Sequence, residues 1–167
     1  MTKDHQRESV QTRNTVKKWL LEQRFSVNDG SDVHHLWGLQ AIDVNQGFGF
    51  GVSQPTRNPE VISIAVTFSF EDYQNELDGL PADERGDFIL ELWRTINTFD
   101  VYFKGNGDPL DSVLIVGYVF MDELRRSVFW REVHSVRRAF WAALWSFEKK
   151  FRRPHTQPPI DALDFLN

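Results

Sequence analysis

Hydrophobic and polar residues alternate along the chain with periods that change from one segment to the next. Between Val16 and Leu20 the apolar positions recur at helical spacing, which predicts a first helix from about residue 14 to a break at residues 28–30. Residues 1–13 show no such period, so we expect them to form a loose N-terminal extension.

Three segments with a period of two follow, at residues 33–44, 47–53 and 61–70. Such alternation is typical of strands, and the short polar breaks between the segments predict an antiparallel meander. The third segment has its large apolar side chains at every second position, namely at Ile62, Ile64, Val66, Phe68 and Phe70. Its other face carries only small, mildly polar residues.

The second half of the chain returns to helical spacing. Residues 71–80 predict a short helix or turn, and Pro81 in a first-turn position predicts a helix that ends near Phe99. Asn106-Gly107 predicts a hairpin turn between strands at residues 101–104 and 111–121. A final helix is expected over residues 122–151, with acids at its start and lysines and arginines at its end.

These elements predict an α+β fold in the order α-β-β-β-α-β-β-α. It would contain a five-stranded, mostly antiparallel sheet and a long C-terminal helix. Residues 14–153 would form a single domain and residues 154–167 a tail, because 167 residues suit one sizeable core better than two.

The residue types in the chain exclude several kinds of functional site. The chain has no cysteine, which excludes disulfides, thiolate metal sites and a cysteine nucleophile. His34 and His35 are adjacent and would point to opposite faces of a strand, so no metal site is expected. We find no nucleophile elbow and no recognisable acid/base pair, and expect neither enzymatic activity nor a cofactor. The polar start and the lack of a long apolar run predict a cytoplasmic protein.

Gly47, Gly49 and Gly51 alternate with phenylalanines and suggest a phosphate-binding loop at first sight. No helix can follow, because the chain continues into Val52-Ser-Gln-Pro, and a phosphate loop needs a helix N-terminus behind it. The stretch therefore predicts a strand with one bare face. That face either allows close packing or strong twist within the fold, or it binds a partner.

Three tryptophans of the final helix raise a similar question. Trp130, Trp141 and Trp145 cannot all lie in its core-facing stripe, which predicts a second apolar surface for a partner. The alternative is that they pack beneath the tail or the first helix. The tail itself has apolar residues in 160–167 that could dock on the bare sheet face, of the same copy or a neighbouring one.

Charge is unevenly distributed. Residues 122–153 carry nine Lys and Arg against four Asp and Glu, whereas the rest of the chain carries ten against twenty. A nucleic-acid face is one interpretation, and it would use Arg125, Arg126, Arg131, Arg137 and Arg138. These arginines could equally form the solvated outer face of a helix, or attract the acidic region at residues 78–91 of the same or a second copy.

The element order resembles the type III secretion chaperone-like fold, including its relatives among small bacterial and archaeal families of unknown function. The resemblance covers residues 14–151 and rests on Trp19-Leu20-Leu21, on Pro81–Arg85 before Phe88–Leu92, and on the hairpin before the long helix. It implies a non-enzymatic, dimeric module, chaperone-like or an adaptor, that binds an apolar or extended segment of a partner protein. A nucleic-acid-associated regulator is the alternative, and no membrane partner is expected.

Overall fold

The computed structural model describes residues 3–30, 33–107 and 110–152. Its internal contacts group the chain into two compact units. Unit 1 contains residues 1–65 and 118–132, and unit 2 contains residues 66–117 and 133–167. Strands β4 and β6 and helix α4 contribute residues to both units. The expectation of a single domain stays a prediction.

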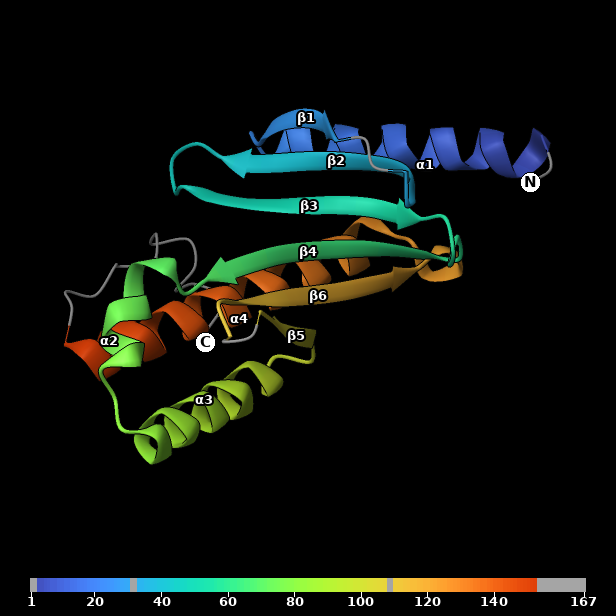
Figure 1. The fold of residues 1–167 in the computed structure, drawn as a ribbon. Coiled ribbons are helices and arrows are strands. Elements are labelled where there is room, and N and C mark those ends of the chain that lie inside the picture. Colours follow the sequence, from blue (N-terminus) through green and yellow to red (C-terminus); the bar gives the residue numbers. More distant parts are fainter. Residues whose placement is uncertain (1–2, 31–32, 108–109, 153–167) are drawn as a thin grey trace. The chain divides into compact units, whose positions relative to one another are not determined.

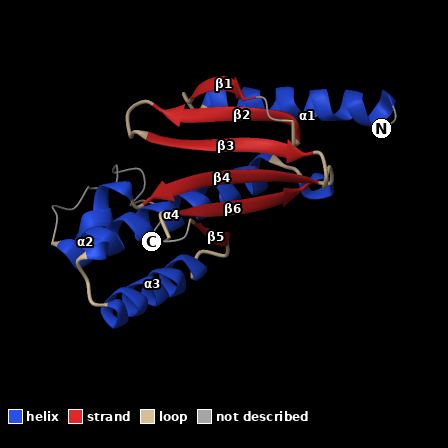
Figure 2. Ribbon diagram, viewed as in Figure 1, coloured by secondary structure: helices blue, strands red, loops and turns tan. Residues whose placement is uncertain are grey.

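Twelve elements follow one another in the described part of the chain, including two 3-10 turns, η1 and η2. They are α1 (Lys3–Glu22), β1 (Ser26–Gly30), β2 (His35–Asp43), β3 (Phe48–Pro55), β4 (Val61–Ser69), η1 (Glu71–Tyr73), α2 (Gln74–Asp78), α3 (Ala82–Asn97), β5 (Tyr102–Asn106), β6 (Ser112–Phe120), η2 (Met121–Glu123) and α4 (Arg126–Phe151). The strands form an antiparallel sheet in the order β1-β2-β3-β4-β6-β5 (Figure 2). The predicted α+β class is confirmed.

In unit 1, helix α1 lies along one side of strands β1 and β2 (Figure 1). Its residues Val16 and Leu20 are fully buried. Gln54 on β3 is also buried, and its Oε1 accepts hydrogen bonds from Ser9 Oγ at 2.7 Å and from Trp37 Nε1 at 2.8 Å. Gln54 Nε2 donates to the Pro59 carbonyl at 2.7 Å, so the buried amide is satisfied at both ends.

In unit 2, the core is a cluster of aromatic rings around Phe147 of α4, which is fully buried. The ring of Phe147 lies 4.8 Å from that of Phe70 and 4.9 Å from those of Tyr73 and Phe88. Lys150 of the same helix lies 3.6 Å from Glu84 of α3. This ion pair joins the long helix to the acidic residues 78–91, but it uses a lysine, and the predicted attraction of the five arginines to that region stays a prediction.

Three predicted boundaries are wrong. Helix α1 begins at Lys3, so residues 3–13 are helical where a loose extension was expected. The helix ends before Arg24, which takes the left-handed conformation (φ 64°) while the Phe25 N–H donates to the Leu20 carbonyl. Residues 26–30 then form a sixth strand instead of the predicted break, because their backbone pairs with β2 although their side chains are mostly polar.

The third boundary is the start of the long helix. It begins at Arg126, and Asp122 and Glu123 lie in the preceding 3-10 turn rather than in its first helical turn. The remaining elements are close to the predicted ones. Pro81 precedes α3, and Gly107 has the positive φ of 86° that the hairpin turn requires.

Candidate functional site

Strand β3 has two unlike faces. Phe48, Phe50 and Val52 are buried and alternate with Gly49 and Gly51. Gln54 shares the phenylalanine face and bonds to Ser9 of α1, so the helix covers this side of the strand. The two glycines therefore point to the opposite side, away from α1.

The glycines of unit 1 differ in what the fold requires of them. A Cβ built on Gly38 would lie 2.7 Å from the Gly30 carbonyl oxygen, so strand β1 can approach β2 only because residue 38 is a glycine. Gly47 precedes β3 in a turn with φ 64°, and it therefore serves the turn rather than the bare strand face predicted for it.

Gly49 and Gly51 face no such restriction. A Cβ at Gly49 would meet only the Ala41 carbonyl oxygen and Ile42 Cγ1, both at 3.6 Å, and one at Gly51 would meet only the Ala65 carbonyl oxygen at 3.9 Å. These are ordinary contact distances within the same sheet. Among the described residues, only atoms of the neighbouring strands lie within 4 Å of either built Cβ, so close packing within unit 1 does not explain these glycines.

We call the side of the unit 1 sheet that contains these two glycines the glycine face. Ile42 lies opposite Gly49 on β2, and Ala65 lies opposite Gly51 on β4. Ser53 and Ser63 are also paired across β3 and β4, and their hydroxyls are 2.8 Å apart. The floor of the face thus consists of small side chains whose polar groups bond to each other.

Two aromatic residues of β6 lie next to this floor. The Met121 N–H donates to the Glu60 carbonyl at 2.9 Å, and counting back along the antiparallel strands places Tyr118 opposite Ser63 and Phe120 opposite Val61. Tyr118 is 39% exposed and Phe120 is 55% exposed, while Ile42 on the other side of the floor is 40% exposed. Sequence reasoning missed these three residues, although their alternation with buried neighbours could have indicated them.

The glycine face also lacks charge in the described part of the chain. Its strand positions are Ser26, Asn28, Gly30, His35, Gly38, Gln40, Ile42, Gly49, Gly51, Ser53, Pro55, Val61, Ser63, Ala65, Tyr118 and Phe120. The charged Asp29 points to the other side, where Arg13 Nη2 lies 2.6 Å and Lys17 Nζ 3.3 Å from its carboxylate. None of these strand positions is Asp, Glu, Lys or Arg, although such residues make up 26% of the chain.

The three tryptophans are more covered than the sequence predicted. In unit 1, the half-buried Trp130 stacks on Phe25, just after α1, with ring centroids 5.9 Å apart. In unit 2, Trp141 is only 7% exposed, and Trp145 stacks on it at 6.4 Å. Packing beneath the first helix was one of the two alternatives predicted for Trp130. Because Trp141 is buried, this side chain has little surface left for a partner.

The arginines make contacts within their own units. In unit 1, Arg126 Nη1 lies 2.9 Å from Glu22 and Arg131 Nε 3.2 Å from Glu132, while Arg125 is exposed. In unit 2, Arg138 lies over the Phe99 ring at 5.9 Å, and Arg137 is half-buried. Burial lowers the pKa of His134 below its ordinary value, and the charges of Arg137 and Arg138 lower it further.

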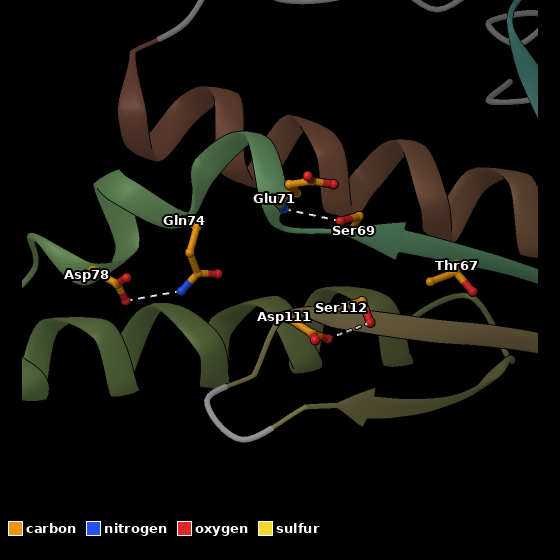
Figure 3. Close-up of a pocket in the computed structure, with 7 residues that line it drawn as sticks. All are labelled: Thr67, Ser69, Glu71, Gln74, Asp78, Asp111 and Ser112. Atoms are coloured by element: carbon orange, nitrogen blue, oxygen red, sulfur yellow. Dashed lines mark hydrogen bonds between the residues drawn. The ribbon is translucent and has the colours of Figure 1, made fainter.

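Unit 2 contains a polar hollow of about 640 Å³ at the end of β4 (Figure 3). Its side chains largely bond to one another or to the adjacent backbone. Gln74 Nε2 donates to Asp78 at 3.1 Å, and Ser112 Oγ donates to Asp111 at 2.9 Å. Arg85 also lies 3.3 Å from Asp78. In the described residues, no cluster of His, Asp and Glu could hold a metal ion, and Asp32 beside His34 lies outside them.

No helix in the described part of the chain is long and apolar enough to cross a membrane. A comparison of the sequence with curated proteins finds no match.

Two solved structures share the fold. An uncharacterized protein from Methanothermobacter thermautotrophicus is 24% identical, with a TM-score of 0.77 over 83% of this chain and 98% of its own. YbjN from E. coli, described as a candidate transcription regulator, is 12% identical, with a TM-score of 0.52 over 82% of this chain and 92% of its own. At these identities both likenesses concern the fold alone. The model of a family of uncharacterized conserved proteins, DUF2299, matches residues 12–147, and the chain belongs to this family.

Proposed function

We propose that the protein is a non-enzymatic interaction module that binds a segment of a partner protein through that segment's apolar residues, on the glycine face. The observation that carries the proposal is the pair Gly49 and Gly51. A glycine in a strand interior costs about 0.5–1 kcal/mol relative to alanine, yet the fold has room for a Cβ at both positions. A cost that the fold does not require is typical of a functional surface.

The exposed side chains beside these glycines support the same function. Ile42, Tyr118 and Phe120 offer apolar contact area around a floor that lets a partner approach the backbone closely. A chaperone-like or adaptor role, as in the type III secretion chaperone-like fold, is the form of this function that we favour. The likeness to YbjN is compatible with a regulator that acts by binding another macromolecule.

A nucleic-acid face is the weaker alternative. Arg126 and Arg131 have carboxylates of the same unit within 3.2 Å, which offset the positive charge that phosphates would need. The glycine face itself offers no cation to a phosphate. Binding of nucleic acid at low salt and its release at high salt would favour this alternative.

The test uses a double variant, Gly49→Val with Gly51→Val. Valine is favoured in strands, so the variant should fold at least as stably as the natural chain, while its side chains fill the floor of the face. Fluorescence anisotropy would measure binding of a panel of labelled peptides whose apolar residues follow either a helical or a strand-like pattern. We expect the double variant to weaken binding of the best peptide by about tenfold or more.

Gly86→Ala is the matched control. Gly86 lies in α3 with open space around it, so an added methyl group leaves the glycine face unchanged and should leave peptide affinity unchanged. The proposal is wrong if no peptide of the panel binds the natural chain, or if the folded double variant binds as tightly.

Homodimer formation is a separate part of the proposal. Light scattering after size exclusion at low and high salt would test it on the full chain. A dimer that persists at high salt would indicate an apolar interface, whereas a monomer at both salt concentrations would contradict the dimer and leave the binding face unaffected.

A further inference from the structure

We infer that the segment bound by the glycine face is an amphipathic α-helix of the partner; this inference rests on the proposed function. Strand β3 pairs with β2 along its length and with β4 at residues 51–53, and the backbone N–H and C=O groups of a strand point along the sheet rather than out of its face. An extended segment laid on the face would find no backbone partners there, because strand addition needs a free edge. A helix satisfies its own backbone and can be buried without that cost.

The dimensions of the face agree with a helix. Small residues occupy the paired middle of β3 and β4, from Gly51 to Ser53 and from Ser63 to Ala65 on this side. Larger side chains lie on the strands beyond, Ile42 on β2 and Tyr118 on β6. Three strand spacings separate β2 from β6, which is about 14 Å. A helix with its side chains is about 10–12 Å wide, so it fits above the floor with Ile42 and Tyr118 along its sides.

Side-chain volume argues against a second copy that uses the same face. Two packed sheets lie about 10 Å apart, and side chains from both sheets fill the space between them. Two glycine faces would bring Gly49 and Gly51 together and leave that space partly empty, which is costly. A helix instead supplies the large side chains that the face lacks.

The absence of charged residues on the face also determines which side chains the bound helix can direct toward it. No described strand position on the face is Asp, Glu, Lys or Arg, and the hydroxyls of Ser53 and Ser63 already bond to each other. A charged side chain of the partner would lose its water there without a replacement. The inward stripe of the helix must therefore consist of uncharged, bulky residues such as leucine, isoleucine, methionine or phenylalanine.

Two synthetic peptides of about 18 residues and identical composition test the inference. One places leucines at positions i, i+3, i+4 and i+7, and the other alternates them with a period of two; Glu and Lys occupy the remaining positions of both. With the full chain, we expect the helical peptide to bind about tenfold tighter than the alternating one. Circular dichroism should show a gain in helix on binding.

Matched variants locate the binding. Gly51→Val should weaken binding of the helical peptide by about tenfold, while Gly86→Ala should not change it. Equal or tighter binding of the alternating peptide would overturn the helix inference and leave the proposed function standing, as would failure of both peptides while a strand-patterned member of the panel binds. If no panel member binds, the proposed function itself is wrong.

Two further outcomes would identify a different occupant. If a chain that ends after Arg153 binds the helical peptide more tightly than the full chain, the chain's own residues 154–167 occupy the face. If the natural chain self-associates and Gly51→Val abolishes that association, a second copy occupies it. Unchanged peptide affinity and unchanged association are the results that support a partner helix.

Discussion

The aromatic cluster of unit 2 and the glycine face of unit 1 use side-chain size in opposite ways. Around Phe147, large rings fill the space between elements and leave that residue fully buried. On the glycine face, two successive outward positions of β3, Gly49 and Gly51, lack a side chain although the sheet has room for one. Burial of the rings stabilises the first region. In the second region, the two glycines lower the stability of the strand and leave the surface of the sheet without side chains.

The largest effect should come from emptying the aromatic cluster. Phe147→Ala should lower the free energy of unfolding by about 3–5 kcal/mol, because it removes the ring that contacts Phe70, Tyr73 and Phe88 and leaves a cavity. Urea denaturation followed by circular dichroism measures the change. Phe120→Ala, which truncates an exposed ring beside the glycine face, should cost about 0.5 kcal/mol or less. Similar losses of stability in both variants would contradict the difference between the two regions.

An intermediate effect is expected at the buried amide beneath the phenylalanine face. Gln54→Ala should cost about 1–3 kcal/mol, because the Ser9 hydroxyl and the Trp37 indole N–H would lose their acceptor while staying buried. Gln40→Ala on the exposed side of β2 is the matched control and should change stability little. If both substitutions cost the same, the two sides of this sheet are not distinguished by burial.

Substituting alanine for glycine at two positions of the same sheet compares a glycine that the fold requires with one that it does not. Gly38→Ala should destabilise the fold by about 1–3 kcal/mol, because its Cβ would meet the Gly30 carbonyl oxygen at 2.7 Å. Gly51→Ala should instead stabilise it by about 0.5–1 kcal/mol, because its Cβ fits and the unfolded chain loses freedom. Thermal unfolding of the two variants should shift the midpoint in opposite directions. A loss at residue 51 would mean that its glycine serves the fold.

The smallest effect should be a pH dependence in the basic part of unit 2. The pKa of His134 is lower in the folded protein, so the unfolded chain binds the extra proton more readily. Stability from this residue is therefore complete above pH 6.5, the ordinary pKa of histidine, and is lost as the pH falls toward the folded-state pKa. His134→Gln should flatten this part of the unfolding profile between pH 7 and pH 5. If the variant has the same dependence of unfolding on pH as the natural chain, other titratable groups cause that dependence.

The sequence predicted most elements because their apolar residues alternate clearly. The face of β4 that carries Ile62 and Ile64 is buried, as its period of two required. Strand β1 was missed because Ser26–Gly30 is short and mostly polar, so only its pairing with β2 makes it a strand. The early start of α1 was not predicted, because buried residues in its N-terminal half include the polar Ser9 and Thr12. Polar residues do not add to the apolar periodicity from which a helix is predicted.

The candidate site was only partly predictable for a related reason. The alternation of glycines with Phe48 and Phe50 indicated a bare face, but not whether another layer covers it. That depends on where α1 packs, which is a long-range property. Tyr118 joins the face only through the register between β4 and β6, and the sequence contains no local signal for that register.

The edge strand β1 has a consequence for aggregation. A strand at the border of a sheet is a template on which other chains can add strands without limit. Here the strand has five residues, and its Asp29 is held by Lys17 and Arg13, with the hydrogen bond from Lys17 as the main cause that keeps the pKa of the carboxyl below its ordinary value. Asp29 therefore keeps its charge in mildly acidic solution, where a charge at this border continues to discourage fibre-like growth.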